Sequence, residues 1–361
     1  MSEPDQRLEL VRRWATDELR LSPQRIEPAS ADASFRRYFR VFTPEGSAVI
    51  MDAPPGKEDI RPYLNVSAML EAASVHVPRV HDFDVARGLV LLEDLGTTQY
   101  LSVLKAGGDA NRLYGDALDA LVDIQIRGRD AALELKLYDR EALVREMALM
   151  PEWFLNRHLA LEPSREQAGV ITEAFEFLVA ECLEQPPVFV HRDYHSRNLM
   201  VTRERNPGVI DFQDALRGPV GYDLVSLLKD LYISWPPARV KEWVRFYRGR
   251  MAERGSHVAG ANETEMLRWF DLAGVQRHLK VLGIFARLWH RDGKAGYLDD
   301  LPLTLRYLQD ACAHYRPLWE LKKLLDAWAV DLAHANARVQ DSLRQEVDKG
   351  AGAGRSGGTV A

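Results

Sequence analysis

The contrast between a short β-rich part and a long helical part constrains the fold of this chain most. Up to about residue 95, short runs of β-branched and aromatic residues are interrupted by Gly and Pro, whereas nearly all of the chain after Gly96 has the periodicity of amphipathic helices. A chain of 361 residues is long enough to bury a large core, and its length favours two lobes or domains. We therefore expect an α+β protein with a small β-rich N-terminal lobe, residues 1–95, and a larger, mostly helical lobe, residues 96–345.

The β-rich part predicts one small sheet with one helix. Residues 38–42 and 47–51 are strand-like, and Thr43-Pro-Glu-Gly46 between them has the composition of a turn. We expect these two runs to pair as an antiparallel hairpin. The other expected elements are a helix over 59–73 and strands over 79–84 and 89–92.

The helical part has one clear start signal. Ser164 and Gln167 have the spacing of a capping box, with Pro163 just outside the helix. The expected helices cover residues 109–127, 140–159, 165–184, 223–232, 238–254, 263–290, 301–315 and 317–345. The end of the chain, residues 346–361, is rich in Gly and lacks periodicity, so a disordered tail is expected there.

A polar cluster within residues 188–211 interrupts the helical part and carries the strongest functional signal. His191-Arg-Asp-Tyr-His-Ser-Arg-Asn198 is followed by Val209-Ile-Asp-Phe212, so an Asn lies five residues after Asp193 and an Asp thirteen residues after that Asn. Phosphoryl transfer requires an oriented hydroxyl and a divalent cation that bridges the phosphate oxygens. Mg²⁺ prefers carboxylate and amide oxygens and keeps several waters. Asp193 is therefore our candidate for the catalytic base, and Asn198 and Asp211 are candidates for Mg²⁺ ligands.

The joint pattern is more specific than its single residues. One Asp or Asn in a loop usually caps a turn or hydrogen-bonds to the backbone, but His-x-Asp-x-x-x-x-Asn followed by an apolar pair and Asp-Phe resembles the aminoglycoside phosphotransferase and choline kinase family, over roughly residues 20–340. The resemblance implies a two-lobed protein-kinase-like fold and ATP- and Mg²⁺-dependent transfer to an alcohol. More narrowly, residues 145–154 and 276–294 resemble the bacterial N-acetylmuramate/N-acetylglucosamine anomeric kinases of cell-wall recycling.

The family resemblance places the nucleotide site in the β-rich part. The turn that covers the phosphates corresponds to residues 29–38, which contain small residues but no Gly. The hinge that meets the adenine edge with its backbone corresponds to Gly88–Gly96. The nucleotide-binding residues implied in this way are Ser30, Ala31, Asp32, Ala33, Ser34, Arg36, Glu93 and Leu95, together with Asn198 and Asp211.

The lysine with which protein kinases contact the phosphates is missing, because the third strand carries Met51 at that place. Four cations are candidates for the missing charge, and no spacing rule chooses among them: Arg36, Arg37, Arg40 and Lys57. Glu71, the candidate partner of such a lysine, is expected on a solvated helix face.

Three further residues near the motif are expected to support it. His191 is expected to orient the loop, and Asp223 to cap a helix and support the loop rather than bind metal. His195 is expected to belong to the linker between Asp193 and Asn198.

The acceptor is predicted from charge. Aminoglycosides are polycations that require acidic sites, whereas the helix expected to flank the acceptor, within residues 271–297, carries five Lys or Arg against two Asp. Trp153, Trp289 and His290 are candidates for stacking on a sugar ring, with the helix core as the alternative. Arg277 is a candidate partner for the lactyl carboxylate that distinguishes N-acetylmuramate from N-acetylglucosamine, with an ion pair between helices as the alternative.

These expectations lead to a kinase that phosphorylates the C1 hydroxyl of N-acetylmuramate and N-acetylglucosamine. Two alternatives stay open. One is a kinase for another small alcohol, such as an aminoglycoside, choline or homoserine. The other is a non-catalytic nucleotide-binding pseudokinase, which the missing lysine favours and the intact Asp193, Asn198 and Asp211 disfavour.

Composition excludes several other classes. A net charge of −6 and a pI near 6.0 argue against a protein that coats nucleic acid. The N-terminus is charged from its start and no apolar run approaches the roughly 20 residues of a membrane span, so a cytoplasmic protein is expected. Cys182 and Cys312 are expected to be buried free thiols. Neither a membrane nor an obligate protein partner is expected.

Overall fold

The computed structural model describes residues 5–31, 35–256, 258 and 260–353. The chain forms two compact units, one of Met1–Leu137 with Pro186–Glu263 and one of Tyr138–Gln185 with Thr264–Ala361. The first unit contains the β-rich part and the whole polar cluster of residues 188–211. The lobe boundary expected near residue 95 falls inside this unit, and the division into lobes stays a prediction.

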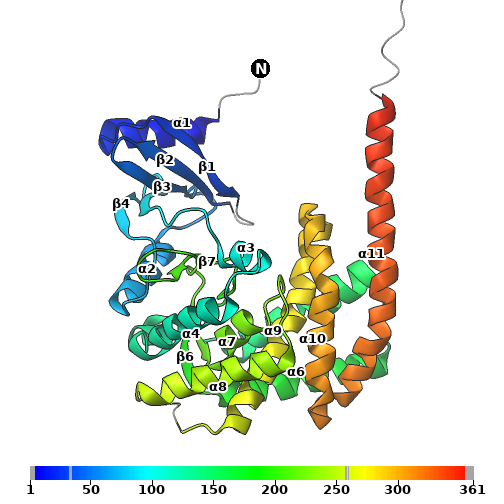
Figure 1. The fold of residues 1–361 in the computed structure, drawn as a ribbon. Helices are drawn as coiled ribbons and strands as arrows, with labels where there is room; N and C mark the ends of the chain where they lie inside the picture. Colours follow the sequence, from blue (N-terminus) through cyan, green and yellow to red (C-terminus); the bar gives the residue numbers. More distant parts are fainter. Residues whose placement is uncertain (1–4, 32–34, 257, 259, 354–361) are drawn as a thin grey trace, which may run out of the picture. The chain divides into compact units, whose positions relative to one another are not determined.

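The first unit begins with a five-stranded antiparallel sheet in the order β1-β2-β3-β5-β4 (Figure 1). Its strands are β1 Arg25–Ala31, β2 Arg37–Thr43, β3 Gly46–Asp52, β4 Val80–Asp84 and β5 Leu89–Glu93. Thr43 pairs with Gly46, which confirms the expected hairpin between β2 and β3. The two further expected strands are confirmed as β4 and β5, and the expected helix as α2, Arg61–Ala72.

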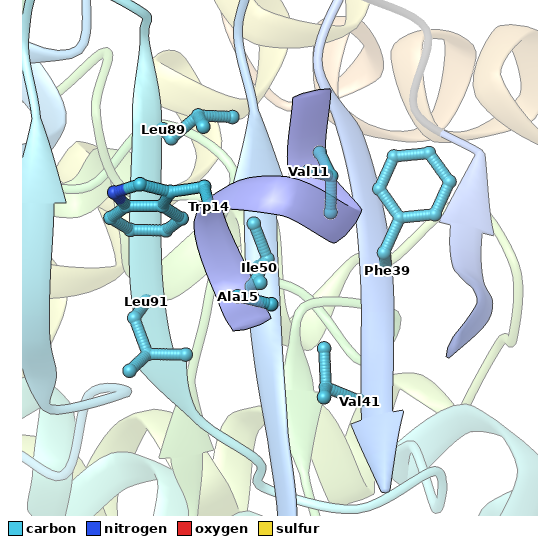
Figure 2. Close-up of a cluster of buried hydrophobic side chains, with 8 residues drawn as sticks. All are labelled: Val11, Trp14, Ala15, Phe39, Val41, Ile50, Leu89 and Leu91. Atoms are coloured by element: carbon cyan, nitrogen blue, oxygen red, sulfur yellow. The ribbon is translucent and has the colours of Figure 1, made fainter. Parts of the chain in front are cut away.

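A short N-terminal helix covers one face of this sheet. Helix α1, Gln6–Arg13, continues into a π-helical turn, Trp14–Glu18. Their apolar side chains pack on inward-facing residues of β2, β3 and β5 (Figure 2), and the cluster consists of Val11, Trp14, Ala15, Phe39, Val41, Ile50, Leu89 and Leu91. Helix α1 was not among the expected elements, because two turns of helix give little periodicity.

The rest of the first unit surrounds the polar cluster with helices and two-stranded ladders. Strand β6 pairs with β9, and β7 pairs with β8. The elements are α3 Tyr100–Lys105, α4 Ala110–Arg127, a 3₁₀ turn Ala131–Glu134, β6 Pro187–Val190, β7 Leu199–Met200, β8 Gly208–Val209, β9 Leu216–Pro219, α7 Gly221–Leu228 and α8 Pro237–Glu253.

The described part of the second unit is helical. Its elements are α5 Arg140–Met147, a π-helix Met150–Leu159, α6 Arg165–Glu184, α9 Glu263–Asp292, a 3₁₀ turn Ala295–Asp300, α10 Leu301–Ala313, a 3₁₀ turn Arg316–Leu318 and α11 Trp319–Ala353. Ser164 and Gln167 cap α6 reciprocally, which confirms the expected capping box.

Three predicted boundaries in the helical part are corrected. The expected helix 140–159 divides into α5 and the π-helix, which has Pro151 in its first turn, where a missing backbone N–H is tolerated. The helix expected over 223–232 is α7, which ends at Leu228. Helix α11 continues to Ala353, into the segment expected as a tail, and residues 354–361 lie outside the described residues.

Cys182 and Cys312 are both buried and form no disulfide among the described residues, as expected. Burial, with a smaller contribution from Glu181, raises the pKa of the Cys182 thiol to about 12. Among the described residues, no helix is long and apolar enough to cross a membrane.

Candidate active site

The polar cluster is a loop that follows the buried strand β6. Three non-glycine residues within 188–211 have left-handed backbone conformations: Arg192 with φ 80°, Arg205 with φ 52° and Asp211 with φ 64°. Such conformations cost free energy and persist where the surrounding structure imposes them, often at functional sites. Arg192 and Asp211 mark the two ends of the segment that brings Asp193, Asn198 and Asp211 together.

His191 ties the start of the loop to the strand that leads to Asp211. Its Nε2 donates to the carbonyl oxygen of Ile210 at 3.1 Å, and its Nδ1 accepts from the backbone N–H of Asp193 at 3.3 Å. Burial lowers the pKa of His191 to about 4, against a smaller opposing effect of the Asp193 charge. The ring is therefore neutral near pH 7 with its proton on Nε2, and it orients the loop as expected.

Asp223 supports the same loop from helix α7. Its buried carboxylate accepts the backbone N–H groups of His191 at 2.6 Å and Arg192 at 3.0 Å. This confirms the expected support. The expected N-cap role is wrong, because α7 begins at Gly221 with Val220 as its N-cap.

Two further anchors were missed at the sequence level. Ser196 donates its backbone N–H, at 3.0 Å, and its hydroxyl to the buried carboxylate of Asp230. The Tyr194 hydroxyl donates to the carbonyl oxygen of Ala117 in α4 at 2.8 Å. A signal for Asp230 was available, since it is an acidic residue two positions after the mostly apolar end of α7. Its carboxylate accepts the hydrogen bonds of Ser196, and α7 ends two residues before it.

Asn198 connects the three central residues of the cluster. Its amide nitrogen donates to the carbonyl oxygen of Asp193 at 3.0 Å and to the carboxylate of Asp211 at 3.2 Å. Because the nitrogen is committed in this way, the amide oxygen is the atom of Asn198 that fits a metal ion. His195 lies in the intervening turn, where its N–H donates to Asp193 and its carbonyl accepts from Asn198, in agreement with the linker position expected for it.

The Asn198 amide oxygen and the Asp211 carboxylate are donors of the kind that Mg²⁺ prefers. Among the described residues, no group of three or more His, Cys, Asp or Glu is gathered as a metal cage. A site with few protein oxygens suits an ion that completes its shell with waters and phosphate oxygens, as Mg²⁺ does in phosphoryl-transfer sites.

Arg36 is the candidate cation that contacts the cluster. Its guanidinium Nη2 lies 3.6 Å from Asp211 Oδ1, and its side chain is 10% exposed. Gln213 donates to the same carboxylate oxygen at 3.0 Å. Arg36 therefore connects the segment that precedes β2 with the expected metal ligand.

The other three candidate cations contact other groups of the first unit. Arg37 binds Asp52, and its ion pair with Asp5 raises its pKa above the ordinary value. Arg40 makes a bidentate contact with Asp94 at 2.7 and 3.0 Å. The Lys57 ammonium lies 4.5 Å above the Phe35 ring.

The predicted phosphate turn is described only at its edges. Ser30 and Ala31 end β1, with backbones opposite Tyr38 and Arg37. Asp32, Ala33 and Ser34 lie outside the described residues, as do the side chains of Ser30 and Ala31.

The predicted hinge, Gly88–Gly96, contains β5 and the three residues after it. Glu93 donates its backbone N–H to Arg79 at 2.9 Å, and Leu95 lies so close to Gly208 that a Cβ there would be 2.7 Å from a Leu95 methyl. Met51 is fully buried in β3, and Glu71 is exposed on α2, as expected.

The four sugar candidates all lie in the second unit. Trp153 is on the π-helix with the Arg157 guanidinium 5.7 Å from its ring, while Trp289 and His290 are at the C-terminal end of α9. His290 Nε2 is 3.3 Å from Nδ1 of His158. Arg277 is buried in the middle of α9, about 18 Å from Trp289 along the helix axis.

Known proteins resemble this chain over most of its length. Residues 25–258 match the phosphotransferase enzyme family. The N-acetylmuramate/N-acetylglucosamine kinase of Pseudomonas aeruginosa is 49% identical over 303 residues, which cover 84% of this chain and 88% of that protein. The protein of the same name from Pseudomonas putida is 43% identical, over 90% of this chain and 97% of that protein.

Solved structures show the fold. The choline kinase LicA of Streptococcus pneumoniae superposes with a TM-score of 0.59 at 13% identity, over 85% of this chain and 99% of that one. Phosphotransferases of the same fold have been solved with ADP or GDP bound. The expected protein-kinase-like fold is therefore confirmed, with an antiparallel sheet at the N-terminus and a mostly helical remainder. The chain belongs to the phosphotransferase enzyme family.

Proposed function

We propose that this chain is an ATP- and Mg²⁺-dependent sugar kinase that phosphorylates the anomeric C1 hydroxyl of N-acetylmuramate and N-acetylglucosamine. It is a kinase with an alcohol acceptor that uses a nucleotide as substrate, as its family membership establishes. The names of relatives at 43–49% identity support the two sugars. The observation that carries the chemistry is Asn198, which holds the backbone of Asp193 and the carboxylate of Asp211 through one amide nitrogen.

In the proposed reaction, Asp193 orients the C1 hydroxyl and accepts its proton while the C1 oxygen bonds to the γ-phosphorus of ATP. The bond from that phosphorus to the β,γ-bridging oxygen breaks, and ADP leaves with its electron pair. An anomeric hydroxyl is more acidic than an ordinary alcohol, so one positioned carboxylate is an adequate base. The backbone around Asp193 is held by His191 and Asn198, which supplies the orientation that phosphoryl transfer requires.

In the same proposal, three residues bind the metal and the nucleotide phosphates: Asp211, Asn198 and Arg36. The Asp211 carboxylate and the Asn198 amide oxygen would hold Mg²⁺, which neutralises charge on the phosphate oxygens when bound. We assign to Arg36 the role of the missing lysine, because its guanidinium is 3.6 Å from Asp211 while Arg37, Arg40 and Lys57 contact other groups. The backbone at Glu93 and Leu95 would meet the adenine edge.

The physiological setting belongs to the same proposal. A kinase for these two sugars serves peptidoglycan recycling, and its substrates would be met in the cytoplasm. Residues 271–297 carry five Lys or Arg against two Asp, which supports a neutral or anionic acceptor rather than a polycationic aminoglycoside.

The test is an acceptor assay with product analysis. Purified protein is incubated with Mg²⁺–ATP and, separately, with N-acetylmuramate, N-acetylglucosamine, choline, homoserine and an aminoglycoside, and the products are assigned by phosphorus NMR. We expect ADP release only with the two amino sugars, with phosphate at C1. Phosphate at C6 would overturn the anomeric assignment, and turnover confined to choline, homoserine or the aminoglycoside would overturn the sugar assignment.

Asp193→Asn tests the assignment of the base. Turnover should fall by about 10²–10⁴-fold while nucleotide affinity is kept, because the variant removes the proton acceptor and keeps the metal ligands. Near-normal turnover in this variant would remove Asp193 from the mechanism.

A further inference from the structure

Asp52 is a fully buried carboxylate at the end of strand β3. Its Oδ1 accepts from the guanidinium of Arg7 in helix α1, with Nε at 2.9 Å. Its Oδ2 accepts from Arg37 at the start of β2, with Nε at 3.2 Å and Nη2 at 2.8 Å. A buried charge requires its partners, and removing one of them is strongly destabilising. Arg7, Asp52 and Arg37 are therefore held together, and we call them the Asp52 cluster.

The N-terminus of α1 makes a second contact with Arg37. Asp5, the N-cap of α1, accepts the backbone N–H groups of Arg7 and Leu8 at 3.1 Å and also forms an ion pair with the Arg37 guanidinium. The short helix that covers the sheet therefore also fixes the side chain with which β2 begins.

The chain directs Arg37 and the adjacent Arg36 to different partners. Successive side chains of a strand point to opposite faces of the sheet, and Phe39 and Val41 of β2 pack against α1 (Figure 2). Arg37 has the parity of these two residues, so it lies on the face that α1 covers. Arg36 immediately precedes β2, and its guanidinium Nη2 is 3.6 Å from Asp211 Oδ1. Holding Arg37 on one face of the strand thus sets the direction in which the side chain of Arg36 leaves the backbone.

We propose that Asp52 is a positioning residue for the nucleotide phosphates. Through Arg37 it fixes the start of β2, and it thereby directs the Arg36 guanidinium toward Asp211 and the phosphates bound beside it. This inference rests on the proposed function, in which Arg36 takes the place of the missing lysine. It also gives α1 a role in nucleotide binding, because Arg7 of that helix holds Asp52.

Charge and position predict opposite effects of Asp52→Asn on nucleotide binding. The variant keeps the shape of the side chain and makes the surroundings of Arg36 more positive, so a purely electrostatic role of Asp52 predicts tighter binding of phosphates. A positioning role predicts weaker binding. The amide oxygen can accept from one guanidinium, but the amide nitrogen is a donor and would face the other, which releases the start of β2.

The experiment measures by calorimetry the dissociation constants of a non-hydrolysable Mg²⁺–ATP analogue and of adenosine, which lacks the phosphates. In Asp52→Asn, the affinity for the analogue should fall about 10- to 100-fold, the contribution of one hydrogen bond to a charged group, while the affinity for adenosine should equal that of the wild type. Equal losses for both ligands, or an affinity for the analogue that is unchanged or higher, would overturn the inference.

A double-mutant cycle with Arg36→Met distinguishes positioning from general destabilisation. Arg36→Met should itself weaken binding of the analogue. Adding Asp52→Asn to that variant should cause no further loss, because the effect of Asp52 is transmitted through Arg36. Additive losses would overturn the inference. Unchanged affinity in Arg36→Met would overturn both the inference and the assignment of Arg36 to the phosphates.

The matched control is Glu18→Gln in the π-helical turn after α1. Glu18 forms an ion pair with Arg87, so this variant also removes a carboxylate that joins the N-terminal helical segment to the sheet, and it changes the charge by the same amount. Its affinity for the analogue should equal that of the wild type. A loss in this control would overturn the assignment to Asp52, because any loosening of the N-terminal segment would then weaken nucleotide binding.

A second variant decides if Asp52→Asn does not fold. Arg37→Gln leaves Asp52 paired with Arg7 and removes the link to β2. Its loss of affinity for the analogue should likewise disappear in the Arg36→Met background, and a persistent loss would overturn the inference. Failure of the proposed acceptors gives a different result: the wild-type protein would then bind the analogue, with the dependence on Asp52 and Arg36 described above, and phosphorylate neither amino sugar.

Discussion

Removing the Asp223 carboxylate should loosen the catalytic loop and destabilise the first unit. In Asp223→Ala, the backbone N–H groups of His191 and Arg192 lose their acceptors in a buried place. A buried donor left without a partner costs about 1–3 kcal/mol. Two such donors predict a loss of about 2–6 kcal/mol in the free energy of unfolding, and turnover should fall because the loop carries Asp193.

Asp223→Asn refines the prediction. The amide oxygen can accept one of the two N–H groups, but the amide nitrogen is a donor and would face the other. The expected loss is therefore about half of that in the Ala variant, on the order of 1–3 kcal/mol. The matched control is Ser226→Ala on the same helix, since the buried Ser226 hydroxyl has no hydrogen-bond partner among the described residues. This control should be neutral or slightly stabilising.

Urea unfolding and amide hydrogen exchange measure the two effects separately. The urea midpoints should rank the control and wild type above Asp223→Asn and then Asp223→Ala. The amides of His191 and Arg192 should exchange faster in both Asp223 variants and at the wild-type rate in the control. An Asp223→Ala protein that is within about 0.5 kcal/mol of the wild type, with both amides still protected, would refute the reasoning.

Three further predictions concern the metal, the loop histidine and a helix contact. Asp211→Ala should weaken binding of an Mg²⁺–ATP analogue more than Asn198→Ala, because it removes the carboxylate; equal affinity in calorimetry would place the metal elsewhere. Burial lowers the pKa of His191 from 6.5 to about 4, so the unfolded chain binds that proton more tightly and stability falls as pH drops between these values, by up to about 1.4 kcal/mol per pH unit. His191→Gln, which keeps a donor for Ile210 and does not titrate, should flatten this dependence of the urea midpoint, and an unchanged slope would assign it to other groups. Gly283→Ala should destabilise the protein, since its Cβ would lie 2.3 Å from the carbonyl carbon of Leu149, whereas Gly249→Ala in α8, with open space around it, should stabilise it by up to about 1 kcal/mol in the same unfolding assay.

The local sequence was enough to predict those helices and strands whose turn or capping residues lie within a few positions of one another. The turn at 43–46 and the alternating runs around it predicted the β2–β3 hairpin, and Ser164 with Gln167 predicted the start of α6. The motif from His191 to Asp211 predicted which residues meet, because its spacing is that of one loop folded back by the turn between β7 and β8. Chain connectivity alone brings Asn198 close to Asp193 and Asp211 once this turn forms.

Tertiary structure decided the contacts between residues far apart in the chain. No local signal distinguishes Arg36 from Arg37, Arg40 and Lys57, and the selection depends on which side chain the fold directs toward Asp211 and which toward Asp52, Asp94 or Phe35. Asp230 and Asp223 likewise hold the loop from 31 to 34 residues away. Burial turns such contacts into strong constraints, because a buried polar group must find its partner within the fold, and the sequence records the group but not the partner.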